Sequence, residues 1–362
     1  MNTNTNYWDT IIIGGGQAGL AMGYELKLRK INFVILDAGV DVGESWNSRW
    51  DSLRLFTPDW AIRYPGQHFP KVDDGFPTKK HMSDFLKAYA SKFRLPVLHR
   101  MKVTKLEKKD AGFEVTTSDR KFTCRQVVVA TGNYSMPKIP SFANQLHGNL
   151  LQIHSAEYKN PDQLPEGDIL VVGAGTSGLQ IALEIAKTGR IVYVSGKPPA
   201  QIPSFMLKYF RRPLIWMMNN RMTIKTRRGR KMRDAIKIQG QAAPLLNISL
   251  EEVLKAGAIH VSRISGVKEG MPFLEDGKQL KVSSIIWCTG FTRDFSWLGE
   301  MQNIIDDHQY PVSYRGITIH RGLYFLGMAF QYAVTSTWIL GIGRDAAYIA
   351  DHIKKSEHAV AC

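Results

Sequence analysis

Apolar and polar positions follow the same order in two separate stretches of the chain. In residues 10–37, an apolar run at 11–13 leads into a glycine-rich turn, apolar residues recur at helical spacing to residue 29, and a second apolar run follows at 31–36. Residues 169–195 repeat this order around a second glycine-rich turn. Short runs of apolar, β-branched residues are typical of buried parallel strands. The pattern therefore predicts two βαβ units.

Loop signals on both sides separate the second unit from the rest of the chain. Prolines at 137, 140, 161 and 165 precede it, and the turn Trp287-Cys-Thr-Gly290 follows it. We therefore expect an α/β fold with two Rossmann-like dinucleotide-binding domains, one inserted in the other. The expected outer domain comprises residues 1–160 and 286–362, and the expected inner domain comprises 161–285 with an insertion at 201–234. An apolar strand at 323–327 and a helix at 345–354 would complete the outer domain.

Each glycine-rich turn has the spacing Gly-x-Gly-x-x-Gly. The first glycine allows a tight turn, the second lets the backbone approach a pyrophosphate, and the third lets the helix pack closely on the strand. The helix N-terminus then faces the phosphate charge. Ordinary glycine turns are the alternative, but each motif follows a strand and opens a helix. The predicted binding residues are Gly14, Gly16, Gln17, Ala18 and Gly19 in the first unit, and Gly173, Gly175, Thr176, Ser177 and Gly178 in the second.

The residue that ends each second strand distinguishes the two nucleotides. Asp37 ends the first unit, where its carboxylate can accept hydrogen bonds from a ribose diol. Ser195 and Lys197 stand at the matching place in the second unit, where a hydroxyl and a cation favour a 2′-phosphate that an acid would repel. The first site therefore suits FAD and the second NADPH, with NADH as an alternative coenzyme. A solvated carboxylate and a plain surface lysine are the alternative interpretations of Asp37 and Lys197.

Two further apolar strands end in Thr-Gly. The first, at 127–132, ends in Ala130, Thr131 and Gly132, and the second, at 285–290, ends in Gly290. Both lie where the chain would cross between the two domains. A strand that ends in Thr-Gly is common, so the pair indicates a two-nucleotide flavoprotein more strongly than either one does. We include these four residues among the predicted nucleotide contacts.

Composition limits the class of protein. The 362 residues are 44% hydrophobic and 22% charged, a balance typical of a folded chain. Its apolar runs are shorter than the roughly 18–20 residues of a membrane-spanning helix, and the polar opening stretch does not resemble a secretory signal, so we expect a cytoplasmic protein.

Cys124, Cys288 and Cys362 lie far apart with no Cys-x-x-Cys, which excludes a disulfide framework, a zinc ribbon and a redox cysteine pair. We expect Cys124 and Cys288 to be small buried hydrophobes, and no metal site.

The excess of positive charge is concentrated in one segment. Lys plus Arg exceed Asp plus Glu by 15 overall, and between Lys208 and Asp234 ten cations stand against one acid. Apolar and aromatic residues at 205–218 accompany them. This combination is typical of contact with an anionic membrane, and basic with aromatic residues also bind single-stranded nucleic acid. We favour a third interpretation, an insertion that covers the active site, whose solvated cations help to attract the coenzyme. We expect no nucleic-acid partner and keep peripheral membrane contact through 205–233 as an alternative.

Over almost its whole length, the chain resembles the class B flavin-dependent monooxygenases. It looks most similar to small bacterial members that are related to the plant auxin-forming flavin monooxygenases. Besides the glycine loops and Thr-Gly turns, the resemblance is carried by Glu44-Ser-Trp-Asn47, Trp50-Asp-Ser-Leu-Arg-Leu-Phe-Thr-Pro58, Pro137, His154-Ser-Ala-Glu-Tyr158, Gly322-Leu-Tyr-Phe-Leu-Gly327, Phe330-Gln331 and Gly343-Arg-Asp345.

This resemblance implies an FAD-dependent, NADPH-using monooxygenase. NADPH would reduce FAD, O2 would add to the reduced flavin, and the oxygenated flavin would transfer one oxygen atom to a small hydrophobic substrate. The reaction would be an N- or S-oxygenation or of the Baeyer–Villiger type. By similarity, the stretch from Trp46 to Arg54 would lie along the flavin, Val103 would face the adenine, and Gln331 would lie near the isoalloxazine edge.

The sequence departs from this family at one place that bears on the chemistry. Many members carry an Asn near the flavin, and the Baeyer–Villiger branch an Arg, whereas Phe56 and Thr57 stand at the matching place here. Phe56, Thr57 and Gln331 are therefore flavin-edge candidates, and no catalytic residue is identified. The alternative function is an NADPH-dependent flavin oxidase or reductase that produces hydrogen peroxide. A membrane-surface or nucleic-acid-binding redox flavoprotein is a further alternative.

The same resemblance indicates where a substrate pocket would form. The expected walls are the segments 56–76, 205–218 and 324–338, which are rich in apolar and aromatic residues. A pocket of this kind favours a hydrophobic amine, thioether or ketone as the substrate.

Overall fold

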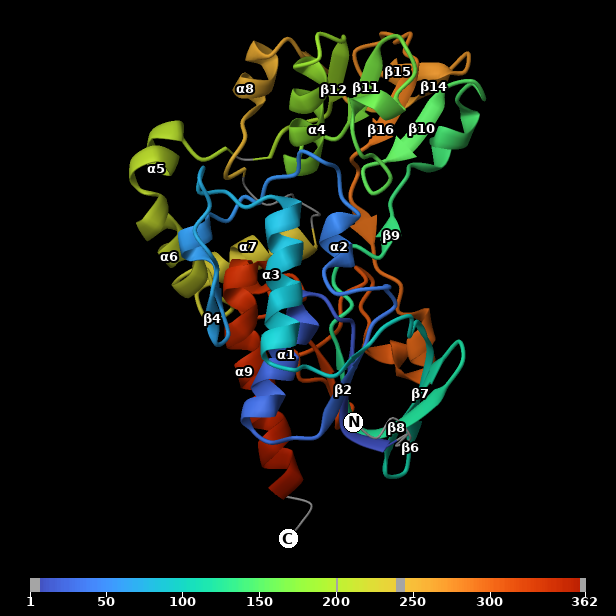
Figure 1. Ribbon diagram of the computed structural model, residues 1–362. Helices are drawn as coiled ribbons and strands as arrows, with labels where there is room; N and C mark the ends of the chain where they lie inside the picture. The colour runs from blue at the N-terminus through green and yellow to red at the C-terminus, as the bar shows by residue number, and fades with distance from the viewer. Residues whose placement is uncertain (1–6, 200, 239–244, 359–362) are drawn as a thin grey trace.

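The two predicted βαβ units are present, and each belongs to its own sheet (Figure 1). In this computed structural model, which describes residues 7–199, 201–238 and 245–358, the first unit consists of β1 (Tyr7–Ile13), α1 (Gln17–Leu28) and β2 (Phe33–Leu36). The second consists of β11 (Ile169–Val172), α4 (Thr176–Ala186) and β12 (Val192–Ser195). The strands of each unit are parallel. The predicted α/β class is therefore confirmed.

The first sheet combines parallel strands with an antiparallel meander. Its order is β5 (Val97–Leu98), β2, β1, β8 (Lys121–Val129), β7 (Gly112–Thr117) and β6 (Val103–Lys109), and β18 (Leu323–Phe325) also pairs with β8. Burial along β8 alternates over 121–125 and is continuous over 126–129. The continuous part includes the residues that run parallel to both β1 and β18. Such a strand is covered on both faces, which explains its unbroken apolar sequence.

The second sheet is parallel throughout. Its order is β10 (Leu151–His154), β16 (Ser284–Trp287), β11, β12 and β13 (Ile259–Val261), and the hairpin β14 (Ile264–Lys268) and β15 (Met271–Leu274) follows β13. The position of β10 in the structure differs from the predicted domain boundary at residue 160. Because β10 pairs with β16, residues 151–154 belong with the inserted unit, and β16 extends it to residue 287. We therefore propose that the insertion spans about residues 138–289.

Two short strands connect the two lobes of the molecule. β9 (Met136–Pro137) follows the first sheet, β17 (Phe291–Thr292) follows the second, and they pair antiparallel. Figure 1 shows β9 between the lobes, with the first sheet below it and the second above it. The two crossings therefore support each other through backbone hydrogen bonds.

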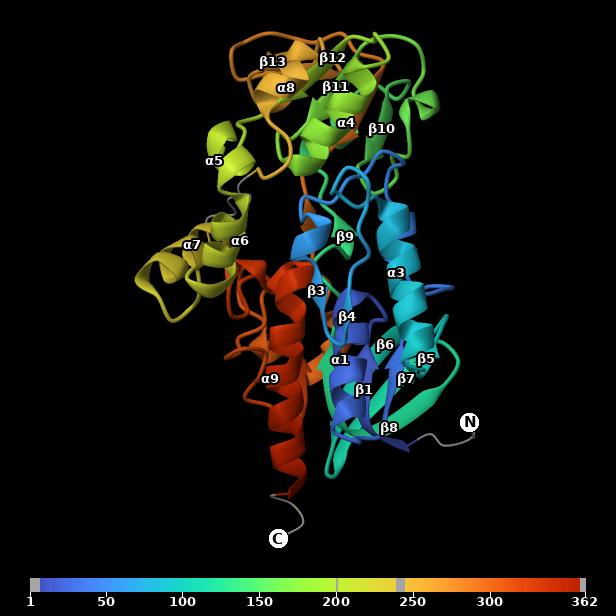
Figure 2. The same cartoon turned by 60° about the vertical axis from the view of Figure 1, so that its left-hand side comes forward.

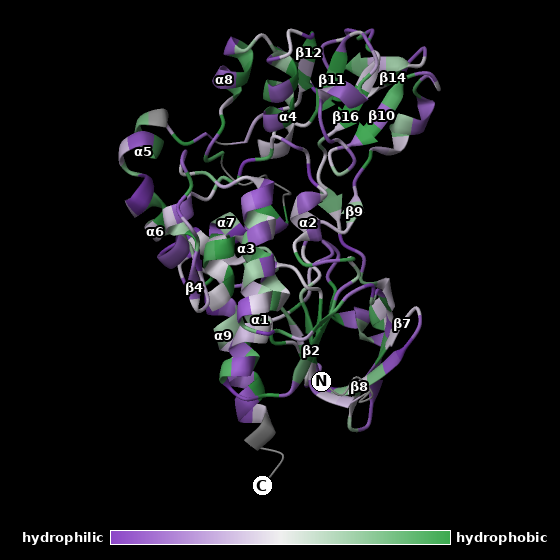
Figure 3. Ribbon diagram, viewed as in Figure 1, coloured by the Kyte–Doolittle hydropathy of each residue, from purple (hydrophilic) through white to green (hydrophobic). Residues whose placement is uncertain are grey.

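Helices pack against both sheets, and apolar residues concentrate in the strands (Figure 3). In the first lobe, α1 packs against the C-terminal helix α9 (Ile339–His358), which is longer than the predicted 345–354. The remaining elements are α2 (Glu44–Asn47), α3 (Lys79–Lys92) and α8 (Leu250–Lys255), the strands β3 (Arg63–Tyr64) and β4 (Gln67–His68), and the 3-10 segments η1 (Asp59–Ala61), η2 (Ser141–Gln145), η3 (Pro161–Gln163), η4 (Ser296–Ile304) and η5 (Val334–Thr337).

The basic segment forms three helices between β12 and α8. They are α5 (Ser204–Tyr209), α6 (Arg211–Asn220) and α7 (Arg227–Lys237). Figure 2 shows them standing out from one side of the molecule, next to the upper end of α9. We call residues 204–237 the basic excursion. Of the helices that the structure describes, none is long and apolar enough to cross a membrane.

The second sheet makes a direct prediction about stability. Ile286 is fully buried in β16 between Ile153 and Val171 of the two neighbouring strands. Ile286→Ala should lower the free energy of unfolding by about 2–5 kcal/mol, because it removes apolar contacts and leaves a cavity. Ile319→Ala is the matched control, since Ile319 is 78% exposed and its truncation should change stability by less than about 0.5 kcal/mol. Urea unfolding measures both, and equal losses would contradict this account of the core.

Candidate functional site

Three glycines of the first loop are each needed for a different physical reason. Gly14 has φ +107°, and a Cβ there would lie 2.5 Å from the carbonyl oxygen of Ala130. A Cβ on Gly19 would lie 1.8 Å from the carbonyl oxygen of Gly14, so only glycine lets the helix approach the strand. Gly16 has no atom within 4 Å of its Cβ position. A side chain at position 16 would fill this open space, which a bound pyrophosphate needs.

The second loop repeats this arrangement. Gly173 has φ +116°, and a Cβ there would lie 2.4 Å from the carbonyl oxygen of Cys288. A Cβ on Gly178 would lie 1.8 Å from the carbonyl oxygen of Gly173, and the Cβ position of Gly175 is open. Two loops with the same three constraints therefore stand on two different sheets. The residues present fit two dinucleotides, one at each loop.

The helices behind the loops leave their first N–H groups available. Gly16 precedes α1 and Gly175 precedes α4, and neither helix has a side-chain cap or an acidic residue in its first turn. Unpaired N–H groups and the positive end of the helix dipole favour a bound phosphate. Gln17 and Ala18 lie in the first turn of α1, and Thr176 and Ser177 in that of α4.

The strand-end residues differ in what their side chains do. Asp37 lies beside the first loop, where its carboxylate accepts hydrogen bonds from the backbone N–H groups of Gly15 and Gly39. Ser195 is buried, donates its hydroxyl proton to the carbonyl of Ser262 (2.9 Å) and accepts from Ile264 N (3.0 Å). This hydroxyl is therefore engaged by backbone groups here, and its contact with a 2′-phosphate stays a prediction. Lys197 is exposed just beyond the strand.

Both Thr-Gly turns lie at the connection between the lobes. Gly132 and Gly290 have φ +78° and +84°, and the Cβ position of each is open. Ala130 donates its N–H to the carbonyl of Ile13, which keeps the first turn beside the first glycine loop. Thr131 precedes Gly132 at this turn. Fully buried His154, at the end of β10, holds the second turn, because its Nε2 lies 3.0 Å from the carbonyl oxygen of Gly290.

His154 is a neutral positioning residue in this arrangement. Its Nδ1 accepts the N–H of Ala156 (3.2 Å), so Nε2 carries the proton that it donates to Gly290. Burial lowers the pKa of His154 below its ordinary value. His154, which belongs to one of the motifs that carry the family resemblance, is therefore a buried residue that holds a turn in place.

The residues expected near the flavin and its adenine lie in separate segments of the first lobe. Trp46 is in α2 and packs against the main core. Arg54 forms an ion pair with Asp74, and its carbonyl accepts from Gln180 Nε2 of α4 (3.0 Å). Val103 is the first residue of β6 and is half-buried. The Trp46–Arg54 segment therefore reaches from the first lobe to the helix of the second glycine loop.

The side-chain amide of Gln331 forms hydrogen bonds with backbone groups of the protein. Its Nε2 donates to the carbonyls of Phe325 (2.9 Å) and Arg315 (3.2 Å), and its Oε1 accepts from Met328 N (3.3 Å). Gln331 thus stabilises the turn after β18, and its place at the isoalloxazine edge stays a prediction.

Phe56 and Thr57 lie at one edge of an apolar cluster. Thr57 is buried, and the ring of Phe56 meets that of Trp338 edge-on at 4.9 Å between centroids. Leu214 and Met218 of α6 join the same cluster. Segments from the three predicted pocket walls therefore meet.

A cavity of about 250 Å³ lies beside this cluster and is partly cationic. Its lining includes Met328, Phe330 and Gln331 and, from α7, Arg233 and Lys237. Burial lowers the pKa of Lys237 to about 8. Of the three predicted pocket walls, 324–338 alone lines this cavity, so the apolar substrate pocket stays a prediction.

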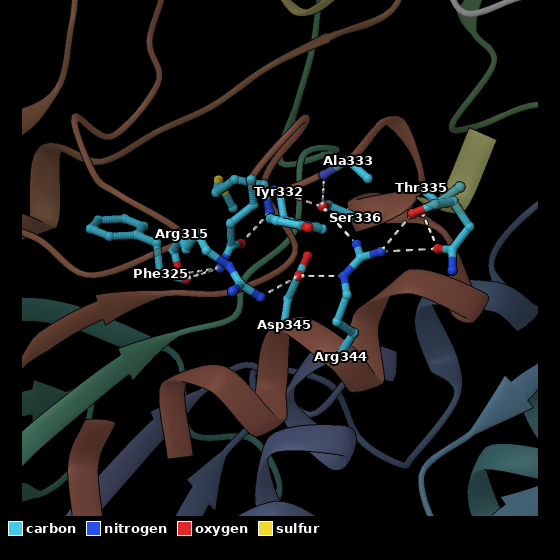
Figure 4. A network of polar contacts seen from close by, with 11 residues as sticks. Arg315, Phe325, Tyr332, Ala333, Thr335, Ser336, Arg344 and Asp345 are labelled. Carbon is cyan, nitrogen blue, oxygen red and sulfur yellow. Dashed lines mark hydrogen bonds and ion pairs between the residues drawn. The ribbon is translucent and has the colours of Figure 1, made fainter. Parts of the chain in front are cut away.

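Sequence reasoning missed a buried polar network at the start of α9 (Figure 4). The carboxylate of Asp345 is 1% exposed, accepts from Arg344 Nε at 3.0 Å and lies 3.9 Å from Arg315 Nη2. Both guanidinium groups lie over the ring of Tyr332, at 4.3 and 4.6 Å. Arg344 also donates to the carbonyl and the side chain of Asn219. The motif Gly343-Arg-Asp345 carried the signal, because it belongs to the family pattern.

Sequence reasoning assigned no charge role to Arg49, a residue of the 46–54 stretch that lies beside the two linkers. Its guanidinium carbon is 5.7 Å from the ring centroid of Tyr134 and 5.3 Å from that of Phe291. Within the described ranges, no carboxylate forms an ion pair with it, and burial lowers its pKa. An anionic group of a nucleotide would compensate this charge.

The two cysteines in the described part of the chain do not form a redox pair. Cys124 is buried in β8, whereas Cys288 follows β16 in the other sheet and is half-buried. Burial raises the pKa of both thiols to about 12, which disfavours the reactive thiolate. The buried position is confirmed for Cys124 and holds only in part for Cys288, and Cys362 lies outside the described residues.

Known proteins are similar to this chain in sequence. The family model described as pyridine nucleotide-disulphide oxidoreductase matches residues 11–242. An uncharacterized CzcO-like oxidoreductase of Geobacillus kaustophilus is 37% identical over 346 residues, which cover 95% of this chain and 98% of that protein. A probable indole-3-pyruvate monooxygenase of Arabidopsis thaliana is 27% identical, over 96% of this chain and 87% of that protein.

A solved structure extends the similarity to the fold. A flavin-containing monooxygenase from Stenotrophomonas maltophilia matches with a TM-score of 0.77 at 24% identity, over 97% of this chain and 99% of that one. These similarities confirm the resemblance that the motifs carry. The chain belongs to the pyridine nucleotide-disulphide oxidoreductase family, as an NAD(P)H-dependent flavoprotein that is similar over almost its whole length to flavin monooxygenases.

Proposed function

We propose that this protein is an FAD- and NADPH-dependent monooxygenase that acts on a small hydrophobic substrate. One oxygen atom of O2 would enter the substrate and the other would leave as water, with NADPH supplying the two electrons. The observation that carries this proposal is the pair of equivalent glycine loops on two sheets. Contacts across the linker bring the two strand ends together, because Phe291 packs against both Tyr134 (5.3 Å) and His154 (4.8 Å). A ligand at each loop would therefore reach the same cleft, as dinucleotide sites at strand ends do.

The first loop suits FAD and the second suits NADPH. Asp37 stands beside the first loop as the ribose contact, and Gly14, Gly16 and Gly19 leave room for the pyrophosphate. A bound flavin accepts hydride from the coenzyme and reacts with O2. The corresponding residues of the second site are Gly173, Gly175, Thr176, Ser177, Gly178, Lys197 and Gly290.

The apolar cluster beside the cleft supports an oxygenation reaction. Phe56, Phe330 and Trp338 pack together with residues of the basic excursion, and such a wall excludes water from a reacting flavin. It also favours an uncharged substrate, by N- or S-oxygenation or a Baeyer–Villiger reaction. The free thiols Cys124 and Cys288 agree with a reducing compartment, so we propose a cytoplasmic location.

A specific observation favours the alternative of a peroxide-forming NADPH oxidase or reductase. The family's Asn or Arg near the flavin is replaced here by Phe56 and Thr57. In addition, the Gln331 amide is held by backbone groups. The chain thus has neither the Asn nor the Arg that steers oxygen chemistry in many members of the family.

Rapid mixing distinguishes the two functions. The purified yellow protein is reduced with NADPH under anaerobic conditions and then mixed with oxygenated buffer in a stopped-flow spectrophotometer. We expect an absorbance band at shorter wavelength than that of oxidised flavin, lasting seconds or longer, because the apolar wall excludes water. Immediate return of oxidised flavin with one hydrogen peroxide per NADPH would show that the alternative is correct.

The two open glycine positions give a paired test of the cofactor assignment. Gly16→Val and Gly175→Val both add a side chain where the structure has open space, so both variants should fold. We expect Gly16→Val to be purified with little or no flavin. Gly175→Val should keep its flavin and show at least about a tenfold higher KM for NADPH, which is the loss of about 1.4 kcal/mol of binding. Equal flavin loss in both variants would refute the assignment.

The exposed lysine at the second site tests the choice of coenzyme. Lys197→Ala should raise the KM for NADPH about tenfold, the scale of one lost charge-assisted contact to phosphate. The KM for NADH should change little, because NADH has no 2′-phosphate. Lys281→Ala is the control, since Lys281 is exposed and precedes the amino end of β16, whereas Lys197 follows the carboxyl end of β12 in the same parallel sheet. An equal change with both coenzymes would rule out the 2′-phosphate role.

A further inference from the structure

The basic excursion has one side that is fixed to the protein body. Leu214 and Met218 of α6 are buried against Phe330, Val334 and Trp338. Asn219, near the end of the same helix, accepts hydrogen bonds from Arg344 of α9 and from Thr335 Oγ1 (2.7 Å). Apolar packing and the polar network of Figure 4 therefore hold the excursion in place.

The other side of the excursion exposes large aromatic side chains. Phe205, Tyr209, Phe210 and Trp216 are each more than half exposed, with Tyr209 at 69%. Large apolar side chains that are exposed close together mark a surface that contacts a partner. Together with Lys208, Arg212 and Arg221, we call these side chains the α5–α6 surface.

The cations of the α5–α6 surface pair with rings and not with carboxylates. Lys208 lies over Tyr209 at 5.2 Å, and Arg221 lies over Trp216 at 5.7 Å. Arg212 lies over Trp60 of η1 at 5.0 Å, which extends the surface onto the first lobe. Within the described residues, the one acid of the segment, Asp234, is paired with Arg233. The positive charge of this surface is therefore largely uncompensated.

We propose that the α5–α6 surface docks on an anionic lipid membrane. Aromatic rings next to cations suit the boundary between headgroups and acyl chains, where the rings enter the apolar layer and the cations meet lipid phosphates. The excursion stands out from the body (Figure 2), so this surface can reach a broad, flat partner. The inference rests on exposed residues outside both glycine loops and does not depend on the proposed reaction.

Two other partners fit the same surface less well. A second copy of this chain in a symmetric dimer would bring the same uncompensated cations against each other. Single-stranded nucleic acid is bound in positively charged grooves, whereas these helices project outward. Charge complementarity and shape therefore favour the anionic membrane.

Vesicle flotation tests the proposal with the purified full-length flavoprotein. Vesicles of phosphatidylcholine alone are compared with vesicles that also contain phosphatidylglycerol, at physiological and at high salt. We expect binding to the anionic vesicles at physiological salt, weaker binding at high salt, and little binding to phosphatidylcholine. Absence of binding to the anionic vesicles, or binding only to a single-stranded oligonucleotide, would overturn the proposal.

Two pairs of variants locate the contact. Lys208→Glu with Arg221→Glu should weaken vesicle binding at least about tenfold, because each basic residue near an anionic surface contributes about fivefold. Lys278→Glu with Lys281→Glu changes the net charge by the same amount in the hairpin region of the second lobe and should have a much smaller effect. Tyr209→Ser with Trp216→Ser should also weaken binding, and Ile319→Ser is its exposed apolar control.

Flavin absorbance and circular dichroism establish that each of these variants is folded. If the folded α5–α6 variants bind anionic vesicles as tightly as their controls do, the proposed surface is wrong. Vesicle binding that these substitutions abolish in folded, flavin-containing protein would support docking independently of the reaction.

Discussion

The close approach of a helix to a strand at each glycine loop is the constraint on which the site depends. A Cβ on Gly19 or Gly178 would lie 1.8 Å from a backbone carbonyl oxygen, a distance that no side chain tolerates. Because these glycines carry none, α1 and α4 start against their strands with free N–H groups. Each loop thereby presents a compact phosphate site at the end of a parallel sheet.

The pairing of the two linkers fixes the two lobes to each other. β9 and β17 run antiparallel between the lobes, and both crossings begin at a glycine with positive φ. His154 holds the second crossing by its contact with Gly290, and Phe291 packs against His154. Arg49 adds a positive charge next to Phe291. In the proposed function, these contacts would hold the two nucleotides close enough to react.

The C-terminal helix connects the cofactor region to the basic excursion. Asp345 lies buried beside Arg315 and Arg344, and Arg344 reaches Asn219 of α6. A buried carboxylate needs such partners, since an unpaired charge in a protein interior is strongly destabilising. The network therefore places an apolar wall next to the cleft and leaves the outer side of the excursion free for another contact.

The sequence by itself determined the features that depend on local backbone geometry. Strand and helix periods, Gly-x-Gly-x-x-Gly spacing and the family motifs predicted both βαβ units and the two loops, because each constraint acts within about thirty residues. Tertiary structure decided what the polar side chains do. Ser195 bonds to Ser262 and Ile264, Arg49 meets Phe291, and β10 pairs with β16, all across long stretches of chain. Residue type shows which hydrogen bonds a side chain can make, but only the folded chain determines which partner lies within reach.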